Sequence, residues 1–548
     1  MLRVLSLLLL VQLCVAQQLE WPKQYTAKGQ IILPYGDIVE PFTAYVDMSG
    51  KGRSRIDYYG DTAVILNLGD QGDNGTMFKI IPETTKEYVN VKTCVQLPGI
   101  SVAPVNPQGV LPDMSMYKYA ADFMYNGVMS EVYMSNNAEE EKNNNYTLIV
   151  RKDNKNPILL RFVGLDRLFG SHYDEYVIEY SDFQTTVDAT VFDYAKKFTC
   201  KSPSSVVFPM TENPMFEFVG AGEYEEKHRS YKVDSDFEEF KGQHSRQYDS
   251  EGEEAKRKTH FRHNHRYIHS MNRRDLPYKL RVNHLTDLAD GEISRMRGYR
   301  HTPNSPRGTL YKPSISDVPQ YYNWRLRGAV TPVKDQGICG SCWSFGTTGT
   351  LEGSYFIKNG MKGLRPLSEQ ALVDCSWGYD NFGCDGGLNE NAYQWIIDNG
   401  CLPTEESYGG GRYLMQDGKC RVNDTGTKCG VQISKFYTVP SGDVSALVMA
   451  IAENGPIGVA IDASHKSFSF YSHGVYYEPD CGNKSENLDH AVLAVGYGTL
   501  TPGDPDSEYW YVKNSWSTHW GNDGYVLMSR KNNNCGVATD ATYADVKL

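Results

Sequence analysis

The segment Gln336-Gly-Ile-Cys339-Gly-Ser-Cys342-Trp343-Ser-Phe decides how this chain is interpreted. Two cysteines separated by two residues occur in redox enzymes and zinc sites as well as beside nucleophilic thiols. No second such pair or histidine pair completes four metal ligands, and no alternation of strands and helices surrounds the segment. The residues after Cys342 can form a helix, whose dipole would stabilise a thiolate at its start. We therefore predict that Cys342 is a reactive thiol that needs no metal or other cofactor.

The cysteine count independently predicts one unpaired thiol. The chain has 12 Cys, and removal of Cys14 with an N-terminal leader leaves 11. In an oxidising compartment ten of these can pair, so one remains for chemistry or for an intermolecular bridge.

Residues 1–16 have the pattern of a secretory signal peptide. A charged start at Arg3 precedes an apolar run that ends at the small residue Ala16. No later stretch is long and apolar enough to span a bilayer, so we expect a soluble product of the secretory pathway, in lysosomes, in acidic granules or outside the cell. Glycans are expected at four Asn-x-Ser/Thr sequons, Asn74, Asn145, Asn423 and Asn483.

The length and charge of the chain exclude other classes of protein. A chain of 548 residues is too long for one core and predicts several domains. The net charge of −12 argues against binding to a phosphate backbone, which would need a basic face. A hydrophobic content of 40% indicates a folded protein rather than a disordered one.

Residues 17–210 contain many short segments rich in Tyr, Val, Ile and Thr, broken by Gly, Asp and Asn. Segments such as 63–68 and 176–180 at regular spacing predict an all-β sandwich or barrel. Cys94 and Cys200 are the cysteines of this region, so a bridge between them is the simplest assignment, with pairing to another region as the alternative. A lipid-carrying barrel is a competing role for this domain.

Residues 222–300 are charged and have a helical pattern. Six residues at intervals of three or four share one helical face, namely Glu253, Arg257, Phe261, Asn264, Ile268 and Asn272. A packed face with a solvated basic back would also explain this stripe. The Pro and Gly residues around 301–316 predict a linker without regular structure, where a processing cut would be tolerated.

A thiolate at Cys342 needs a partner imidazole, and His490 stands at the mouth of an apolar, strand-like run. Asn514 could orient this imidazole, and Trp516 could cover their hydrogen bond. In type and order these motifs resemble those of the papain and cathepsin L family of cysteine proteases. The resemblance implies that Cys342 attacks the scissile carbonyl while paired with imidazolium His490, that Asn514 holds the ring, and that Gln336 binds the oxyanion.

The resemblance also implies a substrate site and a set of disulfides. Gly386 and Gly387 would pair with the substrate backbone in a cleft between two lobes. The pocket for the side chain two residues before the cut would contain Ala460, Leu488, Ala491, Asp540 at its base and Asn389 at its rim. The implied bridges are Cys339–Cys384, Cys375–Cys420 and Cys481–Cys535, and we expect the remaining Cys401 and Cys429 to pair. Ser517 departs from the family, in which Gly follows the Asn-Ser-Trp motif.

The helical stripe resembles the inhibitory propeptide of the same family, so we expect a zymogen. A following motif is imperfect, because Arg281 replaces a Gly and Leu285 a Phe, although Asn283 and Asp287 are kept. We expect release of this helix by acid. The segment 251–274 has seven Lys/Arg against three Glu, a net of +4, to which four histidines would add charge below pH about 6.5: His260, His263, His265 and His269.

The expected architecture is α+β: signal peptide 1–16, all-β domain 17–210, helical inhibitory propeptide 222–300, processing linker 301–316, and a two-lobed papain-like protease, one lobe helical and one β-barrel-like, at 317–548. The β-rich extension resembles that of insect two-chain cathepsin-L-like proteinases, so we expect it to persist as a non-covalent second chain. The expected function is a cysteine endopeptidase acting on proteins or peptides, with no nucleic-acid partner and no membrane span. Two rivals are a catalytically silent binding protein and a thiol oxidoreductase using Cys339 and Cys342.

Overall fold

The structure is a computed structural model that describes residues 19–83, 90–101, 104–139, 142–166, 172–201, 235–301, 305–314 and 317–548. The expected signal peptide, Cys14 and the expected start of the propeptide at 222–234 lie outside these residues. Contacts divide the chain into two compact units, residues 1–242 with Arg273–Asp275, and residues 243–272 with 276–548.

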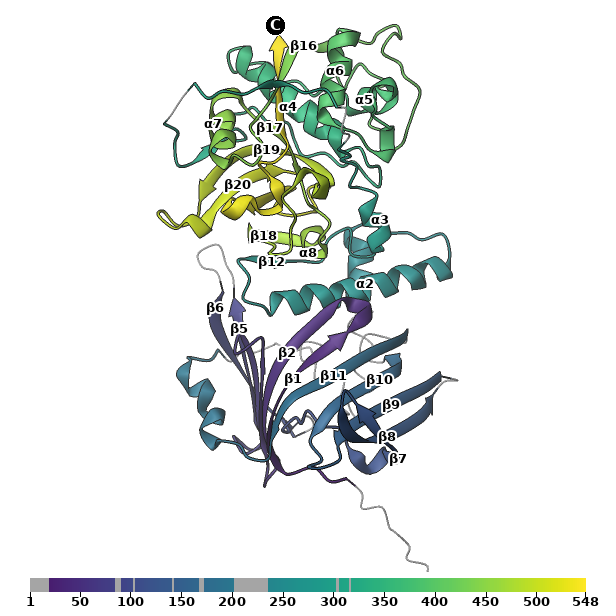
Figure 1. Cartoon of the computed structure of the whole chain (residues 1–548), viewed down its shortest axis with the longest axis vertical. Helices are drawn as coiled ribbons and strands as arrows, with labels where there is room; N and C mark the ends of the chain where they lie inside the picture. The colour runs from purple at the N-terminus through teal and green to yellow at the C-terminus, as the bar shows by residue number, and fades with distance from the viewer. Residues whose placement is uncertain are drawn as a thin grey trace, which may run out of the picture. The chain divides into compact units, whose positions relative to one another are not determined.

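The first unit is built on an antiparallel sheet of eleven strands that fan out with a strong twist (Figure 1). The strand order is β6-β5-β4-β3-β2-β1-β11-β10-β9-β8-β7, so nearly every strand pairs with its neighbour in sequence. An all-β domain is therefore confirmed, but the described strands lie in one sheet and not in the two layers of a sandwich. The strands are β1 Gln24–Leu33, β2 Ile38–Asp47, β3 Arg53–Tyr58, β4 Ala63–Leu68, β5 Thr76–Glu83, β6 Val91–Pro98, β7 Lys118–Tyr125, β8 Val128–Glu139, β9 Lys142–Arg151, β10 Pro157–Asp166 and β11 His172–Gln184.

One face of this sheet is closed by the 3-10 helix η3, Ala189–Lys197. Phe192 of η3 packs with the apolar side chains of β4 and β5, because alternate strand residues such as Leu66 and Ile80 point to the same side. The disulfide Cys94–Cys200 fastens the chain after η3 to β6.

The second unit contains the segments expected to be a propeptide, residues 243–300, and a protease, residues 317–548, which are called by these names below; it has helices and a second sheet (Figure 1). The sheet runs β12-β18-β21-β20-β19-β17-β22-β16-β13, with β14 beside β19 and β15 beside β16. The strands are β12 Tyr278–Leu280, β13 Thr309–Leu310, β14 Tyr322–Asn323, β15 Leu402–Pro403, β16 Cys429–Thr438, β17 Ile457–Ile461, β18 Tyr471–Tyr476, β19 His490–Thr499, β20 Glu508–Lys513, β21 Tyr525–Ser529 and β22 Ala541–Lys547. The helices are α2 Glu251–Asn272, α3 Asp290–Ser294, α4 Cys342–Lys358, α5 Glu369–Cys375, α6 Asn389–Asn399, α7 Val444–Asn454 and α8 Lys466–Ser469.

Helix α2 carries the whole stripe expected from the sequence, and the contacts explain its residue types. Phe261 and Ile268 are buried on the packed side. Asn264 donates to the carbonyls of Thr286 and Leu288, and Asn272 exchanges two hydrogen bonds with the backbone of Leu280. Asn264 and Asn272 therefore satisfy backbone groups of the chain that folds back under the helix, while Glu253 accepts from Arg257 at 2.7 Å.

The linker expected at 301–316 contains regular structure, which the sequence analysis did not predict. Residues Thr309–Leu310 form strand β13, which pairs in parallel with β16, although 301–316 was expected to lack regular structure. The Pro and Gly residues nearby do not prevent this pairing, because a strand of two residues needs few backbone donors and can begin directly after Gly308.

Five disulfides join Cys94–Cys200, Cys339–Cys384, Cys375–Cys420, Cys401–Cys429 and Cys481–Cys535. Among the described cysteines Cys342 alone is free. Within the described residues no helix has the length and apolar character needed to cross a membrane.

Candidate active site

Cys342 is the first residue of α4, so its thiol lies at the amino end of a 17-residue helix. The thiol is fully buried beneath the propeptide segment, where its sulfur accepts hydrogen bonds from the backbone N–H of Gly298, at 3.3 Å, and of Ala491, at 3.4 Å. Burial is the main cause that raises the pKa of Cys342 to about 11, and these two donors oppose it. The thiol is therefore neutral while the propeptide covers it.

His490 begins β19, and its ring is held by Asn514. The Nε2 of His490 lies 2.8 Å from the Oδ1 of Asn514, and the ring of Trp516 lies against the imidazole with centroids 4.8 Å apart. Both Trp516 and His490 have no exposed surface. Burial lowers the pKa of His490 to about 4, and the bond to Asn514 opposes this shift. The imidazole, like the thiol, is neutral in this covered state.

Gln336, expected at the oxyanion site, has its amide occupied by the propeptide. Its Nε2 donates to the carbonyl of Met296, at 2.8 Å, and to the carbonyl of Cys339, at 2.7 Å. Ser515 fixes the other end of the amide by donating to its Oε1 at 2.6 Å. A propeptide carbonyl therefore takes the donor that a substrate oxyanion would need.

The propeptide passes Gly386 and Gly387 and forms one isolated bridge there, at Tyr299. Gly387 donates to the carbonyl of Gly298, and Arg300 donates to the carbonyl of Gly387, at 2.9 and 3.1 Å. The bridge between Tyr299 and Gly387 is parallel. A Cβ on Gly387 would lie 2.9 Å from the Trp343 ring, so only glycine allows this close approach of backbone to the wall of the cleft.

The side chain of Tyr299 lies among the residues that were expected to line the pocket for a substrate side chain. Tyr299 is 6% exposed and packs in one cluster with Ala460, Leu488 and Ala491. Its hydroxyl lies 3.2 Å from the Oδ2 of Asp540, whose other oxygen accepts from Ser485 at 2.8 Å. Asp540 is half-buried and contacts both Tyr299 and Ser485.

Asn389, expected at the pocket rim, is placed differently from the other lining residues. It is 3% exposed, and its amide points toward Gly346 of α4 and Gly458 of β17. This side chain therefore fills space left by two glycines in the interior and does not present its amide to the Tyr299 hydroxyl.

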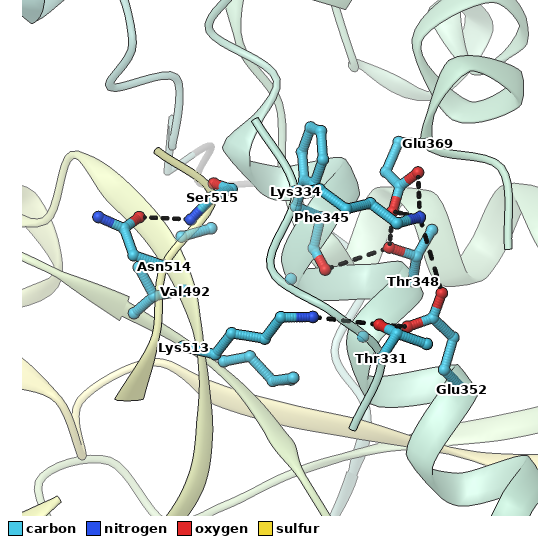
Figure 2. A pocket seen from close by; sticks show the side chains of 14 residues that line it. Thr331, Lys334, Phe345, Thr348, Glu352, Glu369, Val492, Lys513, Asn514 and Ser515 are labelled. Carbon is cyan, nitrogen blue, oxygen red and sulfur yellow. Dashed lines mark hydrogen bonds and ion pairs between the residues drawn. The ribbon is translucent and has the colours of Figure 1, made fainter. Parts of the chain in front are cut away.

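Next to Asn514 the structure holds a buried charged network that the sequence analysis missed (Figure 2). Lys334 lies 2.8 Å from Glu369 and 3.9 Å from Glu352, and Lys513 donates to Thr331 at 3.1 Å, around a cavity of about 20 Å³. Burial raises the pKa of Glu352 and lowers that of Lys513 to about 8. Because Lys513 directly precedes Asn514, this network sits beside the residue that orients the imidazole.

The propeptide contacts the protease through a histidine cluster that was also missed. The ring of His519 lies 5.2 Å from that of His244 and 6.0 Å from that of His284, measured between centroids. Burial, reinforced by nearby cationic groups, lowers the pKa of His244 to about 4 and that of His284 to about 3. No local sequence signal points to this cluster, because its members are far apart in the chain.

Comparisons with known proteins agree with this geometry. Residues 318–545 match the papain family cysteine protease model, and residues 237–293 match the cathepsin propeptide inhibitor domain. A cathepsin L-like peptidase of Aedes aegypti is 48% identical over 326 residues, which cover 57% of this chain and 93% of the relative. Cathepsin L of Sarcophaga peregrina is 44% identical over 57% of this chain and 93% of its own.

Among solved structures, digestive procathepsin L 3 from the larval midgut of Tenebrio molitor aligns with a TM-score of 0.52 and 36% identity. The alignment covers 57% of this chain and 99% of that one. This chain belongs to the papain family of cysteine proteases and carries the inhibitory propeptide of its zymogens.

Proposed function

We propose that the chain is a cysteine endopeptidase precursor in which Cys342 is the nucleophile, His490 the general acid and base, and Asn514 the residue that orients the imidazole. The observation that carries this proposal is the 2.8 Å bond from His490 to Asn514 beside the buried free thiol. Once the propeptide leaves, water reaches both groups, and the burial that keeps them neutral is removed. The thiolate and imidazolium can then form together by proton transfer from Cys342 to His490. The thiolate attacks a peptide carbonyl whose oxygen Gln336 binds, and the imidazolium gives its proton to the leaving amine.

The test is covalent labelling by an irreversible epoxide inhibitor of thiol proteases after exposure to acid. Labelling should occur at Cys342, and the loss of peptide hydrolysis should be proportional to the labelled fraction. The Cys342→Ala variant should show neither labelling nor hydrolysis. A silent binding protein would show no hydrolysis in the wild type. Cys339 is bonded to Cys384, which disfavours an oxidoreductase that cycles between Cys339 and Cys342; activity that survives Cys342→Ala would contradict the proposal.

Activation by acid is the second part of the proposal. Two observations support a part for the four helix histidines expected to act: burial lowers the pKa of His260, and the Nε2 atoms of His265 and His269 lie 3.2 Å apart, so protonation at these places would oppose docking. The cluster of His244, His284 and His519 is better placed, because its protonation would add charge where the propeptide meets the protease. Processing of the intact zymogen as a function of pH, in variants of each group, separates their contributions.

We further propose that the all-β domain stays with the enzyme as a non-covalent second chain in the secretory route, in a lysosome, an acidic granule or outside the cell. Its two described cysteines bond each other, so neither is free for an interchain bridge. The two chains should co-elute under native conditions and separate in denaturant without reductant. Glycans are proposed at the exposed Asn423 and Asn483, and also at Asn74 and Asn145, which are half-buried; glycosidase treatment with mass measurement tests each site.

A further inference from the structure

Two segments that are far apart in the chain meet beside the pocket that Tyr299 occupies. The disulfide Cys481–Cys535 joins them. Farther along the same two segments, the hydroxyl of Thr539 donates to the carbonyl of Asn483 at 2.7 Å. Because a covalent bond and a hydrogen bond both connect the segments, the residues that directly follow in each segment are held close together.

Asp540 is held at its backbone and at both oxygens of its carboxylate. Its carbonyl accepts from the N–H of Ala460 in β17 at 3.0 Å, so the main chain is fixed by the sheet. Oδ1 accepts from the hydroxyl of Ser485 at 2.8 Å, and Oδ2 lies 3.2 Å from the hydroxyl of Tyr299. When the propeptide leaves, the bond to Tyr299 is lost and the bond to Ser485 can stay.

Ser485 is the first residue of the 3-10 helix η8, Ser485–Asn487. Its carbonyl accepts from the N–H of Leu488 at 3.3 Å, and Leu488 is a buried residue of the apolar core. The backbone of Ser485 is therefore tied to the core of the protease and not to the propeptide. A carboxylate that is already turned by such a donor loses less conformational freedom when it makes its next hydrogen bond.

Tyr299 indicates which chemical group suits the pocket. Burial first, and then nearby carboxylates, raise the pKa of Tyr299, so its hydroxyl is protonated and can donate to Oδ2 of Asp540. A phenylalanine side chain would fill nearly the same volume and would offer no donor to this oxygen. Sites that bind a substrate hydroxyl disfavour the analogue that lacks it, because a polar group is then left unpaired. Asp540 is only half-buried, so water compensates part of this loss.

We propose that Ser485 is a positioning residue of the substrate pocket. Its hydroxyl holds the Asp540 carboxylate with Oδ2 toward the end of a substrate side chain, and the pocket therefore prefers tyrosine to phenylalanine two residues before the cut. The inference rests on the proposed protease function. Ser485 acts through Asp540 and does not itself contact the substrate. The preference should be about fivefold in kcat/KM, the effect of one ordinary hydrogen bond.

The first test compares hydrolysis of two peptides by the acid-activated enzyme, Tyr-Arg and Phe-Arg substrates that are otherwise identical. Ser485→Ala should abolish the preference by raising KM for the Tyr-Arg peptide, with kcat unchanged, because this contact is equal in the ground and transition states. Ser485→Thr keeps the hydroxyl and should restore the preference. A loss of kcat for both peptides in Ser485→Ala would indicate a general structural role and would overturn the proposal.

A matched control separates the hydroxyl from a glycan. Ser485 is the third residue of the sequon at Asn483, so Ser485→Ala also prevents glycosylation there. Asn483→Gln prevents the glycan and leaves the Ser485 hydroxyl in place, and it should keep the wild-type preference. Loss of the preference in Asn483→Gln would assign it to the glycan and overturn the role of Ser485, and so would equal turnover of both peptides by the wild type.

The second test needs no hydrolysis and uses the intact zymogen with His490→Ala, which prevents self-processing. Opening is measured as the rate of alkylation of Cys342, which is buried until the propeptide leaves. Tyr299→Phe should speed opening about fivefold when Ser485 is present and clearly less in the Ser485→Ala background. Equal effects in both backgrounds would overturn the proposal. If this coupling is found but the activated wild type hydrolyses neither peptide, the proposed function fails and the positioning role of Ser485 is supported.

Discussion

Replacement of His284 by Gln should weaken the response of the zymogen to acid. In the docked propeptide, burial first, and then Arg246, His244 and His519, lower the pKa of His284 to about 3. A released, hydrated histidine titrates near 6.5. Protonation of His284 is disfavoured in the docked form. The docked form is therefore fully stable above pH about 6.5, and it loses stability as the pH falls from there toward about 3.

The size of the effect follows from these two values. Between pH 6.5 and 4.5 the released histidine gains its proton while the docked one does not, which amounts to two pKa units, or at most about 2.7 kcal/mol. His284 is half-buried, and salt screens part of its interaction with cations, so about 1 to 2 kcal/mol is a reasonable value at pH 4.5. This corresponds to about a 5- to 30-fold change in the opening equilibrium.

Other groups around the cluster titrate too and are unchanged by the substitution. Arg246 pairs with Asp287, whose pKa is raised by burial, and His473 on β18 has its pKa lowered by burial and by the cations of the facing strand β12. Wild type and variant share all of these. The ratio of the opening equilibrium of the wild type to that of the variant therefore isolates the contribution of His284.

Opening can be measured by alkylation of Cys342, which is buried until the propeptide leaves. The wild-type chain and the His284→Gln chain both carry His490→Ala, so that neither processes itself. The rate of alkylation of each is measured from pH 7.5 to 4.5. The ratio of wild type to variant should rise from about 1 to about 10, because the intrinsic pH dependence of alkylation cancels. His301→Gln, at an exposed linker position, should give a flat ratio. A flat ratio for His284→Gln as well would refute the reasoning.

Three further predictions concern the protease fold. Lys334→Met should lower the free energy of unfolding by about 3 to 5 kcal/mol, because two buried carboxylates lose their cation; Lys358→Met, at an exposed pair, should change it by less than about 1 kcal/mol, and equal losses in denaturant titrations would contradict this. Asp540→Ala should reduce kcat/KM for an Arg-Arg substrate about tenfold more than for a Phe-Arg substrate, and equal losses would mean that the acid does not contact the substrate. Ser517→Gly should raise the stability by about 0.5 to 1 kcal/mol, seen as a higher Tm, because Ser517 has φ +65°; an unchanged Tm would show that the loop relaxes around the serine.

The sequence predicted those features that depend on particular residue types placed close together in the chain. The stripe on α2 could be read because its asparagines must bond backbone groups at fixed helical intervals. The start of α4 at Cys342 was predictable for the same reason, since a reactive thiol profits from a helix dipole. The β character of 17–210 followed from residue preferences, but the arrangement in one sheet depends on which strands pair, and alternation alone does not encode that.

Features that depend on contacts between distant segments could not be predicted. Tyr299 gives no local sign that it will occupy a pocket ending at Asp540, more than 200 residues away. The histidine cluster and the network around Lys334 also combine side chains from separate elements. The pairing of β13 with β16 was hidden by composition, because proline and glycine dominate the linker pattern.

The way the propeptide occupies the cleft explains how a protease can hold its own chain uncut. At the sulfur of Cys342 the propeptide presents the N–H of Gly298 and not a carbonyl carbon, and the carbonyl that reaches Gln336 belongs to Met296, two residues earlier. An N–H cannot accept a nucleophile, so the thiol has no bond to attack at that point. The bond between His490 and Asn514 is nevertheless already formed. Under the proposed function, activation requires removal of the occupant and hydration of the two neutral partners, without rearrangement of His490 and Asn514, and we expect the groups that control propeptide docking to set the pH at which activity appears.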